Sequence, residues 1–183
     1  TRVNYREESS EKRGFAMNFE KIDICDVNDS FVRLIREDWA LLTAGEKGNY
    51  NTMTVSWGML GELWGKDVVT VFVRPQRYTY EFMEKYDNFT LSFFGSEYRR
   101  ALSFCGSKSG RDFDKAEECG LTAFETGESV AFEEAKLIIA CRKTAFADMD
   151  PSKFIAPEIE DNYSNGDYHR VYIGEITEVC KKN

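Results

Sequence analysis

The segment Asn51–Trp57 alternates hydroxyl and apolar side chains, and it constrains the fold more than any other stretch of the chain. A strand sends successive side chains to opposite faces, so Thr52, Thr54 and Ser56 share one face and the apolar side chains share the other. This pattern predicts a half-buried strand whose apolar face is anchored in a core and whose hydroxyl face binds a polar ligand. A solvent-facing edge strand is the alternative, because threonine is a good strand former.

Short apolar segments separated by turns continue along the rest of the chain. We expect strands at 39–44, 51–57, 68–74, 88–94, 121–125, 129–133, 136–147 and 168–180, short helices at 28–37, 79–86, 97–104 and 111–118, and loops at 58–67 and 148–167. Many strands with few short helices favour a mainly β fold, an antiparallel barrel with helices at its ends. A parallel doubly wound sheet is disfavoured, because long helices do not alternate with the strands and no Gly-x-Gly-x-x-Gly segment opens a helix after the first strand.

Composition indicates one globular domain preceded by a tail. The chain has 183 residues, of which 42% are hydrophobic. Residues 1–16 are polar and lack a period, which predicts a disordered tail before a domain at 17–183, with Met17 as a candidate natural start.

Charge, hydropathy and cysteine usage exclude several classes of partner and ligand. The net charge of -8 and the lack of a basic run argue against nucleic acid and anionic membrane as partners. No apolar run approaches the roughly 20 residues that span a bilayer. Five scattered cysteines without a Cys-x-x-Cys motif, and a single histidine, argue against a zinc site and suit a reducing cytoplasm.

The segment Arg74–Thr79 has the composition of an anion site. The guanidinium of Arg77 presents a fork of donors that matches phosphate oxygens. Thr79 is placed to N-cap the helix that follows, and the free amide groups at a helix start attract anions. An ordinary turn with a capped helix and solvated arginines is the alternative.

A second cationic segment is the loop Gly106–Gly110, which holds Lys108 and Ser109 between glycines. It lacks the spacing of a triphosphate-binding loop, because Ala101 stands where the first glycine belongs. A nucleoside triphosphate site is therefore excluded, while contact of this loop with a phosphate or a sugar chain remains open.

His169 is the only histidine, and it is the only side chain whose unperturbed pKa lies near neutrality. A lone histidine on a strand is more often structural than catalytic, so both roles stay open. No pair of carboxylates and no Ser/His/Asp arrangement stands out. The sequence therefore shows no machinery for hydrolysis.

Several motifs, taken in order, resemble the flavin reductase-like family, and in particular its flavoredoxin-like branch. They are Asn51–Trp57 with Gly61–Lys66, then Val69–Thr79, then Ser107–Lys115 leading to Gly120–Thr122, and finally His169 before Gly174–Ile176. Each motif alone is weak, but their order over nearly the whole domain is specific.

The resemblance implies a Greek-key split β-barrel that binds FMN and forms a homodimer with its flavin sites near the subunit interface. The hydroxyl strand would line the flavin, the arginine–threonine turn would hold the phosphate, the Ser-Lys-Ser loop would lie near the phosphate or ribityl chain, and the histidine would approach the ring. The corresponding residues are Asn51, Thr52, Thr54, Ser56 and Trp57; Arg74, Arg77 and Thr79; Ser107 and Lys108; and His169 as the catalytic candidate.

The function implied by the resemblance is that of an oxidoreductase. Hydride from NADH or NADPH would pass to FMN, and the electrons would pass on to a flavin, a redox partner protein or a small acceptor. A non-catalytic flavin-binding or electron-carrier barrel is the alternative. We expect an imidazolium at His169 to stabilise negative charge on a reduced flavin. We also expect the partner subunit or the flavin to cover Trp64, with Leu60 and Leu63.

Overall fold

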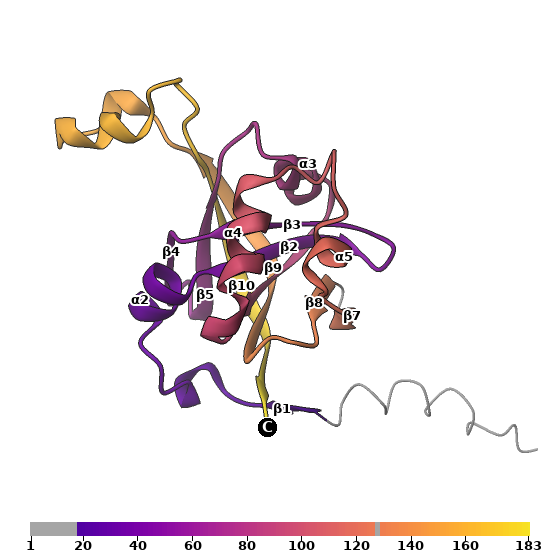
Figure 1. Ribbon diagram of the computed structural model, residues 1–183. Helices are drawn as coiled ribbons and strands as arrows, with labels where there is room; N and C mark the ends of the chain where they lie inside the picture. Colours follow the sequence, from indigo (N-terminus) through magenta and orange to yellow (C-terminus); the bar gives the residue numbers. More distant parts are fainter. Residues whose placement is uncertain (1–17, 127–128) are drawn as a thin grey trace, which may run out of the picture.

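The computed structural model, shown in Figure 1, consists of a large antiparallel sheet with short helices on its faces and at its ends. The structure describes residues 18–126 and 129–183, so the predicted tail and Met17 lie outside the described residues. The strands are β1 (Phe19–Lys21), β2 (Ala40–Glu46), β3 (Asn49–Val55), β4 (Gly58–Leu63), β5 (Lys66–Val73), β6 (Asn88–Phe93), β7 (Ala123–Thr126), β8 (Ser129–Phe132), β9 (Leu137–Asp148) and β10 (Arg170–Lys182). The α-helices are α2 (Phe31–Arg33), α3 (Tyr78–Lys85), α4 (Arg99–Ser107) and α5 (Lys115–Cys119), and 3₁₀ and π turns lie between the strands.

The strands pair in the order β3-β2-β6-β9-β10-β5-β4, with β1 added beside β10 and β7 paired with β8 in a separate ribbon. These pairings are antiparallel, which confirms the predicted mainly β, antiparallel architecture. The predicted loop at 58–67 is wrong, because residues 58–63 form β4 and pair with β5. Its glycines weaken the sequence signal for a strand, but pairing with β5 uses backbone groups and needs no side chain.

Two predicted helices differ from the expectation, one in its type and one in its length. The helix predicted at 28–37 is a short α turn followed by a π turn, Leu34–Asp38, which ends at Trp39 in the left-handed region with a φ of 66°. The helix predicted at 111–118 begins only at Lys115, because the carboxylate of Asp114 caps it by accepting from the amides of Ala116 and Glu117, both at 3.1 Å. Aspartate is a favoured N-cap residue, so this boundary was readable from the sequence.

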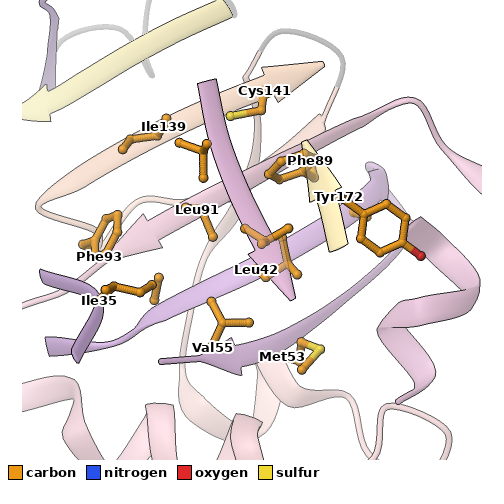
Figure 2. Packing of buried hydrophobic residues seen from close by; sticks show 14 of the residues in the cluster. Ile35, Leu42, Met53, Val55, Phe89, Leu91, Phe93, Ile139, Cys141 and Tyr172 are labelled. Atoms are coloured by element: carbon orange, nitrogen blue, oxygen red, sulfur yellow. The ribbon is translucent and has the colours of Figure 1, made fainter. Parts of the chain in front are cut away.

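The sheet is buried on both faces, so consecutive residues of one strand enter different clusters. Leu42 and Ile139 belong to the larger cluster, which Figure 2 shows with side chains from several strands. Their neighbours Leu41 and Ile138 point to the opposite face, into a second cluster with residues of α4, α5 and β8. Helices α4 and α5 are therefore fixed against one face of the sheet, and the loop between them is held in place.

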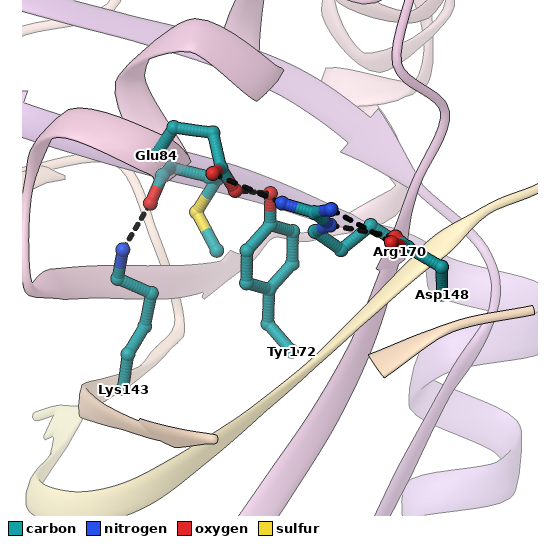
Figure 3. Close-up of polar contacts among 6 residues, drawn as sticks. Glu84, Lys143, Asp148, Arg170 and Tyr172 are labelled. Atoms are coloured by element: carbon teal, nitrogen blue, oxygen red, sulfur yellow. Dashed lines mark hydrogen bonds and ion pairs between the residues drawn. The ribbon is translucent and has the colours of Figure 1, made fainter. Parts of the chain in front are cut away.

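Helix α3 is bound to the start of β10 by a network of polar contacts (Figure 3). Glu84 accepts from the Tyr172 hydroxyl at 2.5 Å and from Arg170 at 3.0 Å. Arg170 also binds Asp148 through two hydrogen bonds of 2.6 and 2.7 Å, and Lys143 donates to the carbonyl of Met83. Because the C-terminal half of α3 is held this way, its N-terminus has a defined place beside β3.

Between β9 and β10 the chain leaves the body of the sheet and returns, as the orange segment at the upper left of Figure 1 shows. We call residues 149–168 the arm. The arm carries two 3₁₀ helices, Pro151–Lys153 and Pro157–Asn162. Within the described residues, no helix is long and apolar enough to cross a membrane.

Candidate functional site

Strand β3 and the residues that follow it form one wall of an open cleft of about 240 Å³, which we call the aromatic cleft. Its remaining walls come from β5, the turn after β5 and the start of β10. The lining residues are Met53, Thr54, Val55, Ser56, Trp57, Phe72, Arg74, Arg77 and His169. Three of the residues predicted from the hydroxyl strand, and the histidine more than 100 positions later, therefore meet in one place.

The hydroxyl face of β3 is only partly available to a ligand. Thr52 is buried, and its hydroxyl accepts from Thr43 at 2.9 Å and donates to the carbonyl of Leu42 at 3.2 Å. Thr54 lines the aromatic cleft, but its hydroxyl donates to the carbonyl of Leu102 at 2.5 Å. Ser56 lies in the cleft and is exposed. Of the three predicted hydroxyls, that of Thr52 is therefore used for hydrogen bonds inside the protein and is not available to a ligand.

Aromatic rings surround the imidazole of His169 at the inner end of this cleft. The ring of Trp57 lies 5.1 Å from it and the ring of Phe72 lies 6.3 Å from it, centroid to centroid. Trp57 is 44% exposed, so one part of its ring remains open to a ligand. These rings offer a flat, apolar surface to a planar group.

The electrostatic surroundings keep His169 neutral. Burial, and next the positive charge of Arg74, lower the pKa of the imidazole to about 4, against the smaller opposing effect of Asp167. At neutral pH the ring is therefore uncharged. The expected imidazolium is wrong for the protein in this state, because the cleft that shelters the ring also removes it from water.

Arg74 is held by the arm. Its guanidinium binds Asp167 at 2.7 Å, donates to the carbonyl of Asn162 at 2.9 Å and lies 5.1 Å from the centre of the Tyr163 ring. It lines the aromatic cleft and is not among the residues that line the neighbouring cationic cleft. Its position therefore differs from that of Arg77, although both were predicted to hold one phosphate.

The second cleft, of about 210 Å³, is lined by cations, and we call it the cationic cleft. It brings together the two cationic segments that the sequence singled out, the turn after β5 and the end of α4. The lining residues are Gln76, Arg77, Tyr78, Thr79, Ser107, Lys108, Ser109, Arg111 and Lys115. Four of these side chains are cationic and none is a carboxylate. Arg77 lines both clefts, so the two adjoin there.

The cations of this cleft differ in how far other groups offset their charge. Arg111 forms an ion pair with Glu81. Arg77 instead donates to the carbonyl of Gly106 at 2.7 Å, and burial, then the nearby Arg74, lower its pKa. A half-buried guanidinium that is bonded to a carbonyl keeps its full charge, and an anion would relieve its loss of hydration.

Lys115 is the most deeply placed of the four cations. It is 5% exposed, and its ammonium donates to the carbonyls of Thr52 at 2.8 Å and Cys105 at 2.9 Å. Burial is the main cause that lowers its pKa to about 8, and Arg77 adds to the effect. Lys115 ties α5 to β3 and to α4, and it adds positive charge behind the cleft.

The start of α3 forms the wall between these cations and β3. The N-cap residue is Arg77 and has no side-chain capping bond, so the prediction that Thr79 caps the helix is wrong. Thr79 lies one residue into the helix, and its hydroxyl accepts from the Asn51 amide at 2.7 Å. A Cβ on Gly110 would stand 1.9 Å from Oδ1 of Asn51, so only glycine allows the loop to approach β3 this closely.

Asn51 and Thr52 therefore support the site without lining either of the two clefts. They line a separate, wider cavity of about 480 Å³ together with Tyr78 and Lys115. Ser107 and Lys108 line the cationic cleft, and both are exposed; their predicted contact with the phosphate or ribityl chain stays a prediction.

Sequence reasoning missed several residues of the site. Phe72 was part of a predicted strand, and its alternation with buried Val71 and Val73 was the available signal. Lys115 stood inside a predicted helix, and nothing in its spacing distinguished it from a solvated lysine. Tyr163 and Asp167 lay in a predicted polar loop, and no periodic signal connected them to the histidine.

Comparison with known proteins identifies the domain. The family model described as Flavin reductase like domain matches residues 32–183. A search for similar sequences among curated proteins found none.

Solved structures share the fold at low sequence identity. An FMN-binding domain of a flavin reductases-like enzyme from Shewanella baltica matches with a TM-score of 0.64 and 18% identity, over 90% of this chain and 77% of that one. Flavoredoxin from Methanosarcina acetivorans matches with a TM-score of 0.63 and 22% identity, over 87% and 74%. Flavoredoxin of Desulfovibrio vulgaris matches with a TM-score of 0.61 and 19% identity, over 90% and 77%. These likenesses confirm the predicted fold.

Proposed function

The chain belongs to the flavin reductase-like family, and from this premise we propose that it is an FMN-binding oxidoreductase. It takes hydride from NADH or NADPH onto FMN and passes the electrons to a free flavin, a partner protein or a small acceptor. The observation that carries this proposal is the pair of adjoining clefts, one walled by aromatic rings and one by cations, with Arg77 common to both.

The residues of the two clefts match the chemistry of FMN. Its planar ring suits the aromatic cleft, where Trp57 and Phe72 offer ring surfaces and Ser56 a hydroxyl. Its phosphate dianion suits the cationic cleft, where Arg77 and Lys108 supply charge and none of the described lining residues is a carboxylate. The first amides of α3 and the hydroxyl of Ser109 add neutral donors.

When bound, FMN supplies the two-electron chemistry, and the protein supplies binding, orientation and electrostatics. Arg77 would hold the phosphate, and Trp57 would offer a ring surface to the flavin in the adjoining cleft. His169 offers a neutral imidazole rather than a charge. The described lining of the aromatic cleft includes no carboxylate or lysine, which agrees with hydride transfer that needs no general acid.

Anaerobic reduction tests the proposed function. The purified protein is expected to be yellow or to take up added FMN, and its absorbance between 300 and 550 nm should bleach with NADH or NADPH faster than free FMN does. A protein that binds FMN but bleaches no faster than free FMN would be a flavin-binding or electron-carrier protein instead. A protein that takes up no FMN would contradict both functions.

We also propose that the protein is a homodimer in the cytoplasm. Exposed apolar side chains gather on and beside β4, the last strand of the sheet order: Trp57, Met59, Leu60 and Trp64 are between 36% and 62% exposed. Apolar side chains grouped in this way gain by being covered. Light scattering at micromolar concentration should give twice the chain mass with FMN bound, and a monomer would rule the dimer out.

A further inference from the structure

The hydroxyl of Tyr163, a residue of the arm, contacts the imidazole of His169, which lines the aromatic cleft. Its oxygen lies 2.9 Å from Nδ1 of His169, and both residues are buried, at 4% and 7% exposure. The two rings lie 5.5 Å apart at an interplanar angle of 76°, which lets the hydroxyl meet the edge of the imidazole. This contact is shielded from water, so its geometry is fixed by the protein.

The position of the hydroxyl proton determines which imidazole nitrogen carries hydrogen. Two acceptors are within reach of the Tyr163 hydroxyl, namely Nδ1 of His169 and the sulfur of Met149 at 3.2 Å. A thioether sulfur is a weak acceptor, and an unprotonated imidazole nitrogen is a strong one. The hydroxyl therefore donates to Nδ1, and in a neutral ring the single proton then lies on Nε2.

The groups around His169 favour the neutral ring. Arg74 and Asp167 are the charged groups that act on it, and they are paired with each other at 2.7 Å. The Arg74 guanidinium also lies over the Tyr163 ring. Its charge and the burial of the imidazole both disfavour a second proton, and Asp167 only partly offsets them.

We propose that Tyr163 is a positioning residue that holds His169 in its Nε2–H form, so that a neutral donor is presented to an acceptor atom of a bound flavin or nicotinamide. The inference rests on the proposed function for the identity of that acceptor. A carbonyl oxygen or an unprotonated ring nitrogen is the chemistry that this donor recognises. A neutral donor adds no charge, so its contribution stays constant over the pH range in which the ring is uncharged.

The chain offers a direct test, because it contains one histidine. In protein labelled with ¹⁵N-histidine, a single pair of imidazole nitrogens gives the proton-correlation spectrum. The protein without flavin should show hydrogen on Nε2 and a bare Nδ1, unchanged between about pH 8 and pH 5. A spectrum with hydrogen on Nδ1, or on both nitrogens at pH 7, would overturn the proposal.

Two tyrosine variants separate positioning from a general effect of the arm. Tyr163→Phe should abolish the preference for the Nε2–H form. Tyr168→Phe is the matched control, because that ring also packs against Tyr163 while its hydroxyl binds Glu160. The control should keep the wild-type spectrum. A wild-type spectrum in folded Tyr163→Phe would refute the role of the hydroxyl.

The rate of FMN reduction tests whether the Nε2–H form of His169 contributes to function. Tyr163→Phe should slow flavin reduction by NADH or NADPH about three- to tenfold while FMN stays bound, the effect of one neutral hydrogen bond, and Tyr168→Phe should not. An unchanged rate in Tyr163→Phe would overturn the positioning role. Failure of wild-type protein to reduce FMN, together with the expected spectrum, would remove the proposed function and leave the tautomer assignment standing.

Discussion

Arg77→Ala should weaken binding of FMN far more than binding of riboflavin, which differs from FMN by the phosphate alone. Arg77 is half-buried, its guanidinium is bonded to the carbonyl of Gly106, and within residues 18–126 and 129–183 it forms no ion pair. A hydrogen bond to a charged group contributes about 1.5–3 kcal/mol. At about 1.4 kcal/mol for each factor of ten, the Kd for FMN should rise about tenfold or more.

Arg111→Ala is the matched control within the same cationic cleft. Its charge is already offset by Glu81, and both side chains of that pair are about half exposed. Because Glu81 already offsets its charge, Arg111 should add little to the attraction for the phosphate, so the Kd for FMN should rise about fivefold at most, which corresponds to about 1 kcal/mol. The structure thus predicts different losses for two arginines that line the same cleft.

Titration of flavin fluorescence with each variant measures both constants, and the thermal midpoint reports whether a variant is folded. The expected pattern is a large loss of FMN affinity in Arg77→Ala with riboflavin affinity nearly unchanged. If Arg77→Ala lost equal affinity for FMN and for riboflavin, the assignment of the phosphate to the cationic cleft would be refuted. If both variants lost equal affinity for FMN, the ion pair with Glu81 would not reduce the contribution of Arg111 to phosphate binding.

Two further predictions follow from the pKa of Lys115 and from the packing of Gly174. The pKa of Lys115 in the folded protein is lowered to about 8, so its ammonium is mostly charged at pH 7 and mostly neutral at pH 9. If the phosphate needs this charge, FMN should bind about tenfold more weakly at pH 9 than at pH 7. The affinity for riboflavin, measured in the same titrations, should not show this change. Gly174→Ala should destabilise the fold by about 1–3 kcal/mol in urea, because a Cβ there would stand 2.6 Å from the Phe89 ring. Gly61→Ala, with open space around its Cβ, should change stability by about 0.5 kcal/mol or less, and equal effects of the two variants would contradict the packing argument.

Local patterns in the sequence were sufficient for most of the strands and for the position of α3. They failed where backbone pairing replaced side-chain signals, as in β4 with Gly58 and Gly61. The predicted start of α5 was also wrong, although its N-cap Asp114 is of a residue type that favours that position. In each case a long-range pairing or a single capping contact decided the boundary.

The candidate site was predicted as separate motifs, and only the fold decides which of them meet. Arg74 and Arg77 are three residues apart, yet one is held by the arm and the other faces the cationic cleft, because the turn after β5 directs them differently. Thr52 and Ser56 were predicted to share a strand face, but β3 ends at Val55, so Thr52 is buried in the strand and Ser56 follows it and is exposed. Residue type and spacing therefore predicted which kinds of side chain form the site, but they did not predict which groups each side chain contacts.

The contact between the arm and His169 could not be predicted from the sequence. Tyr163 is only six residues from His169, but the intervening chain has no period that would orient one ring toward the other. What brings them together is Arg74, which binds Asp167 and Asn162 and thereby fixes the returning end of the arm against β5. An arginine that was predicted to bind phosphate thus orders the segment that contacts the only histidine. Arg74→Ala should accordingly change the imidazole signals of His169 in the ¹⁵N spectrum, while the preference for FMN over riboflavin, which reports on the cationic cleft, should change little.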